Sequence, residues 1–317
     1  MLTRDDVRRA EQRIAGHVRR TPLVPSRSAG LWLKLENEQI SGAFKARGAA
    51  SALTALSPSQ RAGGVVTHSS GNHGRALAEM GALLGVDVTV VVPETALPHK
   101  VTAVRAAGAT VVVVPVTERV AVAESYVHRG KTLVPPFDHL DVMAGQGTVA
   151  LEVLEQAQAA GAVVRRVWAP VGGGGLLSGI AVALSDTAVE VLGAEPELAG
   201  DYVASVDAGR RLAWDVADTV RTVADGLRLP SVGERPWEHL SRLGTLAVTV
   251  SEQAILDAQQ WLADQGIVAE PSGAVSVAAA LAHRLPGGPV PAPSQGDDGI
   301  DVAIVSGGNV PDDASTR

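Results

Sequence analysis

The chain has 317 residues, a formal net charge of −7 at pH 7 and no cysteine. The lack of cysteine excludes disulfides, thiolate catalysis and zinc–thiolate sites, and the acidic balance without a long basic run argues against nucleic acid or an anionic membrane as partner. The N-terminus is polar and no apolar run is long enough to span a bilayer, so we expect a cytoplasmic protein without a membrane partner.

The first half of the chain alternates between strand-like and helix-like segments. Thr3 is expected to cap an amphipathic helix that ends before Thr21-Pro22. An alternating apolar strand at 31–36 is followed by Lys45 and a helix at 49–53. The next segments predict strands at 65–67, 88–92 and 110–114 and helices at 74–84, 100–107 and 118–128. The unbroken apolar run at 111–114 is typical of a strand covered on both faces.

The second half continues the alternation. It predicts a helix from 144 through 155, strands at 164–169, 189–193, 246–250 and 302–305, a helix at 251–263 capped by Ser251, and a Pro-, Gly- and Asp-rich loop at 286–299. Strands that alternate with helices indicate parallel sheets with right-handed crossovers. We therefore expect an α/β fold, with a discontinuous large domain at 1–63 and 139–317 and a small αβ domain at 64–138.

Lys45 lies near a strand-to-helix junction, in the stretch Ser41-Gly42-Ala43-Phe44-Lys45-Ala46. The small neighbours leave room for a bulky group beside the lysine. Burial next to Phe44 would disfavour the ammonium form and make the amine a better nucleophile toward an aldehyde. For a lone lysine, however, a surface position at the start of a helix is the more common case.

Two further stretches lie between a strand-like and a helix-like segment, where open parallel sheets bind ligands. Four glycines at 172–175 allow backbone N–H groups to converge on an anion such as phosphate, although a glycine run is also typical of a flexible turn. The absence of a following Gly-Lys-Ser/Thr argues against an ATP-type loop. The stretch Ser69-Ser70-Gly71-Asn72-His73 places hydroxyls and amides at the start of a helix, which suits a substrate carboxylate.

These stretches, followed by Ser306-Gly307-Gly308-Asn309, resemble in order the signature of fold-type II pyridoxal-phosphate enzymes. The branch that the chain resembles most is that of the serine/threonine dehydratases and serine racemases, and the resemblance runs from about residue 20 to 310. It implies a fold of the tryptophan synthase β-like kind, with two open parallel-sheet αβα domains, and a homodimer.

The resemblance also implies a role for each matching residue. Lys45 would bind the aldehyde of pyridoxal 5'-phosphate covalently, and Phe44 would pack against its ring. Asn72 would hydrogen-bond the ring hydroxyl, and Ser306 would face the pyridine nitrogen. The phosphate would be held by Gly172, Gly173, Gly174, Gly175 and the Leu176 amide, and the substrate by Ser69, Ser70, Asn72 and His73.

Some matches leave alternatives open. Ser70 corresponds to the serine that similar racemases use as an acid/base opposite the lysine, so it permits racemisation without establishing it; the alternative is a serine that only caps the helix. Arg75 stands where family members usually carry Gln, and it could bind an acidic substrate or point to solvent. Relatives that need a metal bind magnesium or calcium at a segment that corresponds to Glu195, the Ala199 carbonyl and Asp201, although an exposed acidic loop would look the same. Glu270 matches a further motif near the cofactor and is expected to be structural.

The resemblance implies an ammonia-lyase that converts L-threonine and/or L-serine to 2-oxobutanoate or pyruvate and ammonia by α,β-elimination. Lys45 would remove the α-proton, and the cofactor phosphate would protonate the leaving hydroxyl. A serine racemase or a threo-3-hydroxyaspartate dehydratase could use the same scaffold. His73 and the doubled serine argue against a cysteine synthase-like β-replacement enzyme, and Lys45 argues against a non-catalytic cofactor-binding protein.

Overall fold

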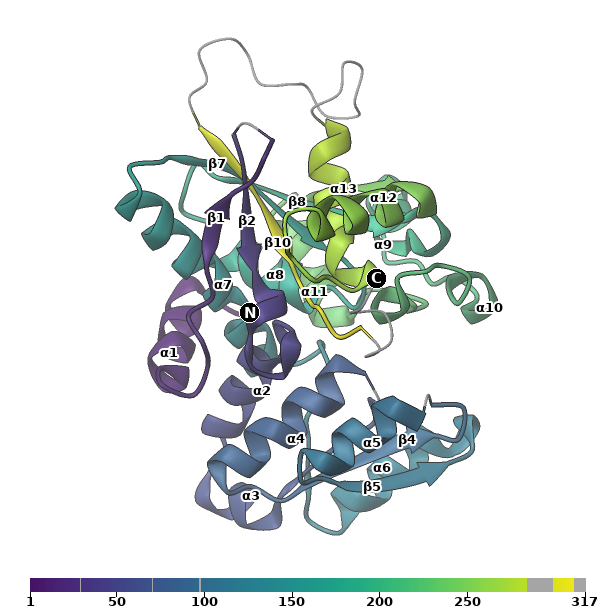
Figure 1. The fold of residues 1–317 in the computed structure, drawn as a ribbon. Coiled ribbons are helices and arrows are strands. Elements are labelled where there is room, and N and C mark those ends of the chain that lie inside the picture. The colour runs from purple at the N-terminus through teal and green to yellow at the C-terminus, as the bar shows by residue number, and fades with distance from the viewer. Residues whose placement is uncertain (29, 70, 97, 284–298, 311–317) are drawn as a thin grey trace.

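Two β-sheets organise the part of the chain that the structure describes (Figure 1). The computed structural model describes residues 1–310 except 29, 70, 97 and 284–298. The larger sheet has the strand order β1-β2-β10-β7-β8-β9, and the smaller has the order β5-β4-β3-β6. β1 pairs antiparallel with β2, and the other pairs in these sheets are parallel. The parallel α/β architecture expected from the sequence is therefore confirmed.

The strand bounds show how the chain builds each sheet. The larger sheet consists of β1 (Leu23–Pro25), β2 (Leu31–Leu35), β7 (Val164–Pro170), β8 (Glu190–Pro196), β9 (Leu246–Val250) and β10 (Ile300–Val305). The smaller sheet consists of β3 (Val65–Thr67), β4 (Val88–Pro93), β5 (Thr110–Val114) and β6 (Thr132–Leu133). The smaller sheet thus comes from one continuous segment, whereas the larger sheet uses the chain before and after it. The division into domains at 63/64 and 138/139 stays a prediction.

Helices cover both faces of the larger sheet. One face packs on α1 (Arg4–Ile14), α7 (Leu140–Ala159) and α8 (Gly175–Ala183), and the other on α12 (Glu252–Ala263) and α13 (Pro271–His283). The helices α9 (Asp201–Ala208), α10 (Val216–Thr219) and α11 (Glu234–Arg242) and the short turn η5 (Asp225–Leu227) complete this part of the molecule. The two apolar layers on either side of the sheet form its core.

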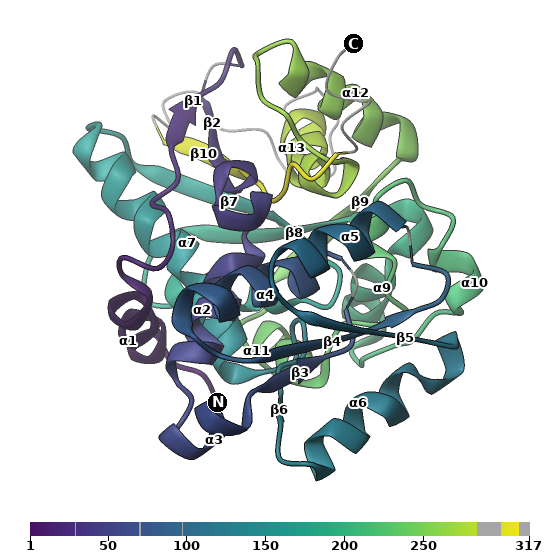
Figure 2. The ribbon, with the colours of Figure 1, turned by 60° about the horizontal axis from the view of Figure 1, so that its bottom comes forward.

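The smaller sheet also lies between helices. Figure 2 shows α4 (Asn72–Leu84) and α5 (Pro98–Ala106) on one side of it and α6 (Arg119–His128) on the other. The helix α2 (Lys45–Thr54) contributes Ala49, Ala50 and Leu53 to the core that includes α4, and α3 (Pro58–Gly63) follows it. Since α2 also packs on α7, it connects the two cores.

Several local predictions are confirmed. Thr3 forms a capping box with Asp6, and Ser251 accepts a hydrogen bond from the amide of Ala254. The helix predicted from 144 begins earlier, at Leu140, and the first helix ends at Ile14. The loop predicted at 286–299 lies, up to residue 298, outside the described residues. No helix in the described ranges has the length and apolar composition to cross a membrane.

The prediction that 111–114 is covered on both faces is wrong. β5 is an edge strand of the smaller sheet, and the side chain of Val113 is 49% exposed. The helices α4 and α6 pack on the inner strand β4 and α5 contacts β5, but this helical cover leaves Val113 exposed. An unbroken apolar run was therefore not enough to predict an inner strand.

Candidate active site

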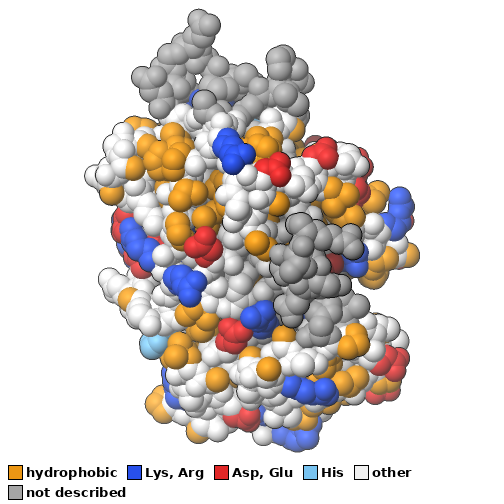
Figure 3. Space-filling model, in the orientation of Figure 1, with side chains coloured by type: hydrophobic (Ala, Val, Ile, Leu, Met, Phe, Trp, Pro, Cys, Tyr) orange, Lys and Arg blue, Asp and Glu red, His pale blue; other side chains and the backbone are white. Residues whose placement is uncertain are grey.

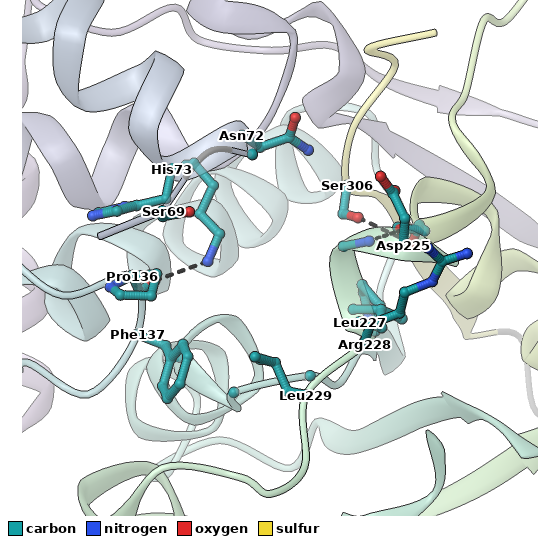
Figure 4. A pocket seen from close by; sticks show the side chains of 18 of the residues that line it. Ser69, Asn72, His73, Pro136, Phe137, Asp225, Leu227, Arg228, Leu229 and Ser306 are labelled. Atoms are coloured by element: carbon teal, nitrogen blue, oxygen red, sulfur yellow. Dashed lines mark hydrogen bonds between the residues drawn. The ribbon is translucent and has the colours of Figure 1, made fainter. Parts of the chain in front are cut away.

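A cavity of about 490 Å³ lies where the loops after β3, β7 and β10 meet. The carboxyl ends of parallel strands are the usual ligand-binding edge of such sheets. In Figure 4, Ser306, Asp225 and Arg228 lie across the cavity from Ser69, Pro136 and Phe137. The lining includes the sequence-predicted residues Phe44, Lys45, Ser69, Asn72, His73, Gly172, Gly173, Gly174, Gly175, Leu176 and Ser306.

Lys45 is the first residue of α2, and its side chain enters the cavity. Its Nζ donates to the carbonyl of Pro136 at 2.8 Å and lies 4.9 Å from the centre of the Phe44 ring. Burial lowers the pKa of Lys45 to about 8. A substantial fraction of the amine is therefore unprotonated just above neutral pH, as nucleophilic or basic chemistry requires.

The glycine loop connects β7 to α8 at the opposite wall. A Cβ at Gly173 would lie 2.2 Å from the ring of Phe137, so a side chain cannot fit there. Gly174 adopts φ +81° and caps α8, which has no side-chain cap among the described residues. The amides of the first turn are therefore available to an anion, and the positive end of the α8 dipole points toward it.

The serine–asparagine loop leads into α4. Asn72 is the first residue of this helix, and Ser69 lines the cavity. His73 is buried, and its Nε2 donates to the carbonyl of Val134 at 3.0 Å. Burial, and then the positive charge of Lys45, lower the pKa of His73 to about 3, so the imidazole is neutral at physiological pH. Ser70 lies outside the described residues.

Ser306 and Glu270 close the far side of the cavity. Ser306 follows β10, is buried, and its hydroxyl lies 3.4 Å from the Ser272 carbonyl. Glu270 accepts a hydrogen bond from Nδ2 of Asn72 at 2.5 Å, and burial raises its pKa to about 7. The sequence indicated that Glu270 lies near the site, but not that it contacts Asn72.

Sequence reasoning missed most of the charged side chains in the cavity wall. Lys100 of α5, which covers the smaller sheet, forms an ion pair with Asp225 of η5, which belongs to the part built on the larger sheet. Both residues line the cavity. The Nε atom of Arg119 is buried and has no hydrogen-bond partner among the described residues. His68 directly precedes the serine loop, but no local motif marks the other charged positions, because the fold brings them together from distant segments: Lys100, Arg119, Asp225 and Arg228.

The predicted metal ligands lie away from this cavity. Glu195 accepts hydrogen bonds from the amides of Tyr202 and Val203, and Asp201 accepts one from the amide of Val232. Both carboxyl groups are buried, so the alternative of an exposed acidic loop is wrong. Burial raises the pKa of Asp201 to about 7, and burial and the nearby charge of Asp201 raise the pKa of Glu195.

The carboxyl groups of Glu195 and Asp201 could bind a cation, but two side chains do not make a complete set of metal ligands. Oδ1 of Asp201 is buried and has no hydrogen-bond partner in the described ranges, which is where a hard cation would bind. The described residues contain no group of three or more His, Asp or Glu arranged for a metal ion. A ligand set here would therefore need backbone oxygens, such as the carbonyl of Ala199.

A buried lysine and a glycine loop thus line one cavity at the carboxyl ends of parallel strands, an arrangement that suits a phosphorylated carbonyl compound. The chain matches the family model described as pyridoxal-phosphate dependent enzyme over residues 14–292, and it belongs to this family. The match covers the lysine, the asparagine loop and the glycine loop. Ser306 lies beyond it.

Within this family, the chain is similar to dehydratases and racemases of hydroxy amino acids. The chain is 35% identical to a catabolic L-threonine dehydratase of Staphylococcus aureus, over 96% of this chain and 88% of that protein. It is 39% identical to a beta-hydroxyaspartate dehydratase of Paracoccus denitrificans, over 88% and 90% of the two chains. The structure of a serine racemase from Dictyostelium discoideum superposes with a TM-score of 0.87, at 34% identity, and covers 98% of this chain and 99% of that one. The fold-type II architecture expected from the motifs is confirmed.

Proposed function

We propose that the chain is a pyridoxal-phosphate-dependent ammonia-lyase that converts L-threonine and/or L-serine to 2-oxobutanoate or pyruvate and ammonia by α,β-elimination. The observation that carries this proposal is that the buried amine of Lys45 lies in the same cavity as the glycine loop at 172–175. This loop leads into α8, whose first amides have no side-chain cap among the described residues. The relatives described as threonine dehydratases support the substrate assignment.

The residues present fit the cofactor. The glycine loop packs too closely against Phe137 to admit a side chain at Gly173, and the amides of the first turn of α8 would bind the phosphate. Ser306 would face the ring nitrogen, and Asn72 would donate to the ring oxygen. When bound, the cofactor supplies an electron sink for the α-carbon of the substrate. The neutral hydroxyl of Ser306 favours a pyridinium less than a carboxylate would, which suits elimination from a short-lived carbanion.

The protein side chains would handle the substrate itself. Ser69 and the start of α4 would bind the substrate carboxylate, because α4 also begins without a side-chain cap in the part of the chain described. The amine of Lys45, once free, would remove the α-proton. His73 would hold the loop in place through Val134, because its Nε2 is already engaged there. A role of Ser70 as a second acid/base stays a prediction.

A second candidate is dehydration of an acidic substrate such as threo-3-hydroxyaspartate. The cation at Arg119 has a buried Nε without a partner in the described part of the chain, next to a cavity that must already bind one carboxylate. A second carboxylate would complement it. The relative described as a beta-hydroxyaspartate dehydratase supports this candidate.

The test supplies L-serine, L-threonine and threo-3-hydroxyaspartate separately to the cofactor-loaded protein and measures 2-oxo acid, ammonia and D-amino acid. The proposal expects equal amounts of 2-oxo acid and ammonia from threonine or serine, and loss of activity in Lys45→Ala but not in Lys131→Ala, a lysine outside the cavity. Faster turnover of hydroxyaspartate that is lost in Arg119→Ala would favour the second candidate. D-amino acid without 2-oxo acid would contradict both.

Three further features are part of the proposal. Glu195, Asp201 and the Ala199 carbonyl would hold Mg²⁺ or Ca²⁺, which would relieve the repulsion between the two buried carboxylates and stabilise the start of α9. A melting temperature that rises with either ion in the wild type, but not in Asp201→Asn, would support this site, and no rise would contradict it.

The protein would act in the cytoplasm, as a homodimer.

A further inference from the structure

A chain of side-chain hydrogen bonds runs from α4 into the cavity. The guanidinium of Arg75 donates to Oδ1 of Asn309 at 2.9 Å. Nδ2 of Asn309 donates to Oδ1 of Asn72 at 2.9 Å, and Nδ2 of Asn72 donates to Glu270 at 2.5 Å. These residues come from α4, from the segment after β10 and from the residue before α13. The fold therefore aligns three donors that all point in one direction.

The chemistry of the end groups fixes this direction. A guanidinium can only donate, so Asn309 must turn its carbonyl oxygen toward Arg75. A backbone carbonyl can only accept, and Nδ2 of Asn309 donates to the carbonyl of Ser41 at 2.8 Å. Asn309 is thus oriented from both sides. Its amino group then engages the oxygen of Asn72, so the amino group of Asn72 must face Glu270 and the cavity.

The surrounding backbone packs closely against this chain of hydrogen bonds. Ser41 adopts a left-handed conformation with φ 66°, which is uncommon for a residue with a side chain, and its carbonyl reaches Asn309. A Cβ at Gly42 would lie 2.4 Å from Oδ1 of Asn309. A Cβ at Gly307 would lie 2.3 Å from the Glu270 carboxylate. Any side chain at either glycine would displace a member of the hydrogen-bond chain.

We propose that Arg75 is a positioning residue: by donating to Asn309 it fixes the Asn72 amide with its amino group toward the cavity, as a donor to the ring oxygen of the bound cofactor. The inference rests on the proposed function, since it needs a lysine-bound pyridoxal phosphate. An amide has two hydrogens, so Asn72 can donate to Glu270 and to the ring oxygen together. A glutamine in place of Arg75 could donate or accept, so Asn309 would be oriented from one side only, by the Ser41 carbonyl.

A donor held against the ring oxygen favours its ionised form. Because a hydrogen bond to a charged group is stronger than one to a neutral group, loss of this donor shifts the ionisation by about tenfold. The ratio of the visible to the near-ultraviolet absorption band of lysine-bound pyridoxal phosphate reports this ionisation. It is a spectroscopic signature that a purely structural role of Arg75 would leave unchanged.

The experiment compares this band ratio in the cofactor-loaded wild type and four variants. In Asn309→Asp the new carboxylate accepts from Arg75 but cannot donate, so Asn72 turns its amino group away from the cavity and the ratio falls about tenfold. Arg75→Met removes the donor and lowers the ratio several-fold. Arg75→Lys keeps a donor and holds the ratio within about twofold. Glu79→Gln still accepts from Nε of Arg75 and leaves the ratio unchanged.

Melting temperatures of the apoproteins show that each variant folds. A ratio that stays within twofold in both Asn309→Asp and Arg75→Met would overturn the inference, as would a fall in Arg75→Lys as large as in Arg75→Met. A wild type without any visible band, or with a band that survives in Lys45→Ala, would instead overturn the proposed function. The two failures are therefore distinguishable in one set of spectra.

Discussion

The side chain of Lys45 owes its reactivity to loss of water. Its ammonium donates to the Pro136 carbonyl, which compensates only part of its lost hydration, and burial lowers its pKa to about 8. Roughly one amine in ten is then unprotonated at pH 7, whereas an exposed lysine offers well under one in a thousand. Burial thus prepares the nucleophile before any cofactor binds.

This shift predicts how cofactor attachment depends on pH. The rate at which the apoprotein binds pyridoxal phosphate covalently should rise about tenfold per pH unit below pH 8 and level off above it, because only the free amine attacks the aldehyde. Between about pH 8 and 10.5 the native state binds fewer protons than the unfolded state, so Lys45 makes the free energy of unfolding rise with pH there.

Rapid mixing of apoprotein and cofactor at a series of pH values measures this rate through the appearance of the visible band. A midpoint near pH 8 agrees with a desolvated amine. A rate that keeps rising to pH 10 would mean that Lys45 is hydrated like a surface lysine.

Individual motifs could be predicted from the sequence because each is local. The lysine junction and the glycine loop are each encoded in a few consecutive residues, and their small side chains indicate what must approach them. The contact between Asn72 and Glu270 could not be predicted, since nearly two hundred positions separate the two residues. The same holds for the unpartnered Nε of Arg119, which only the fold brings beside the cavity.

Among the elements, α2 is held in place by a buried ionic cluster two residues beyond Lys45. Arg47 donates to Glu36 at 2.8 Å and to Glu152 of α7 at 2.7 Å, and Lys34 of β2 donates to the same Glu152 at 2.6 Å. Two cations and two anions make the cluster neutral. Because these side chains are almost entirely buried, the cluster fixes α2 against β2 and α7.

Removing one anion should therefore destabilise the protein strongly. Glu152→Ala leaves Lys34 and Arg47 buried with a single carboxylate, and the free energy of unfolding should fall by about 3–5 kcal/mol. Glu155→Ala, one turn further along α7, removes an ion pair with Arg20 in which both side chains are more than half exposed, and should cost less than about 1 kcal/mol. Urea denaturation of the two apoproteins measures both values. Equal costs would contradict a fixing role for the cluster.

The elements were predictable where they have an amphipathic pattern. α1 and α12 have a polar face and a side-chain cap, and both were predicted. α13 was not, because it begins with Pro271-Ser272-Gly273 and is lined by small, buried residues on most sides, so the 3.6-residue period is lost. β1 has three residues, too few for any period to appear. The apolar run of β5 suited an inner strand, but strand order depends on the whole sheet.

At the scale of the whole molecule, strand order decides where the site lies. β10 and β7 are neighbours inside the larger sheet, and β3 lies inside the smaller one, so the loops after these three strands converge on one cavity. The motifs that the sequence separates by more than two hundred residues meet there. The order of the motifs along the chain indicated this fold because it resembles that of a known family. The spacing between the motifs alone could not predict the order of the strands in each sheet.

Charge is also distributed unevenly between surface and cavity. The chain is acidic, with a net charge of −7, and the visible part of the face in Figure 3 carries both signs interspersed. The cavity wall, in contrast, has more cationic or protonatable side chains (Lys45, His68, Lys100, Arg119 and Arg228) than acidic ones (Asp225 and Glu270). An acidic protein thus offers a locally positive site to an anionic cofactor.

The most direct test of this account is to trap the cofactor on its lysine. The protein is incubated with pyridoxal phosphate, reduced with borohydride and digested, and the modified peptide is identified by mass spectrometry. The account predicts one labelled peptide, modified at Lys45. Label on Lys34, Lys100 or Lys131 in place of Lys45, or on no peptide, would contradict it.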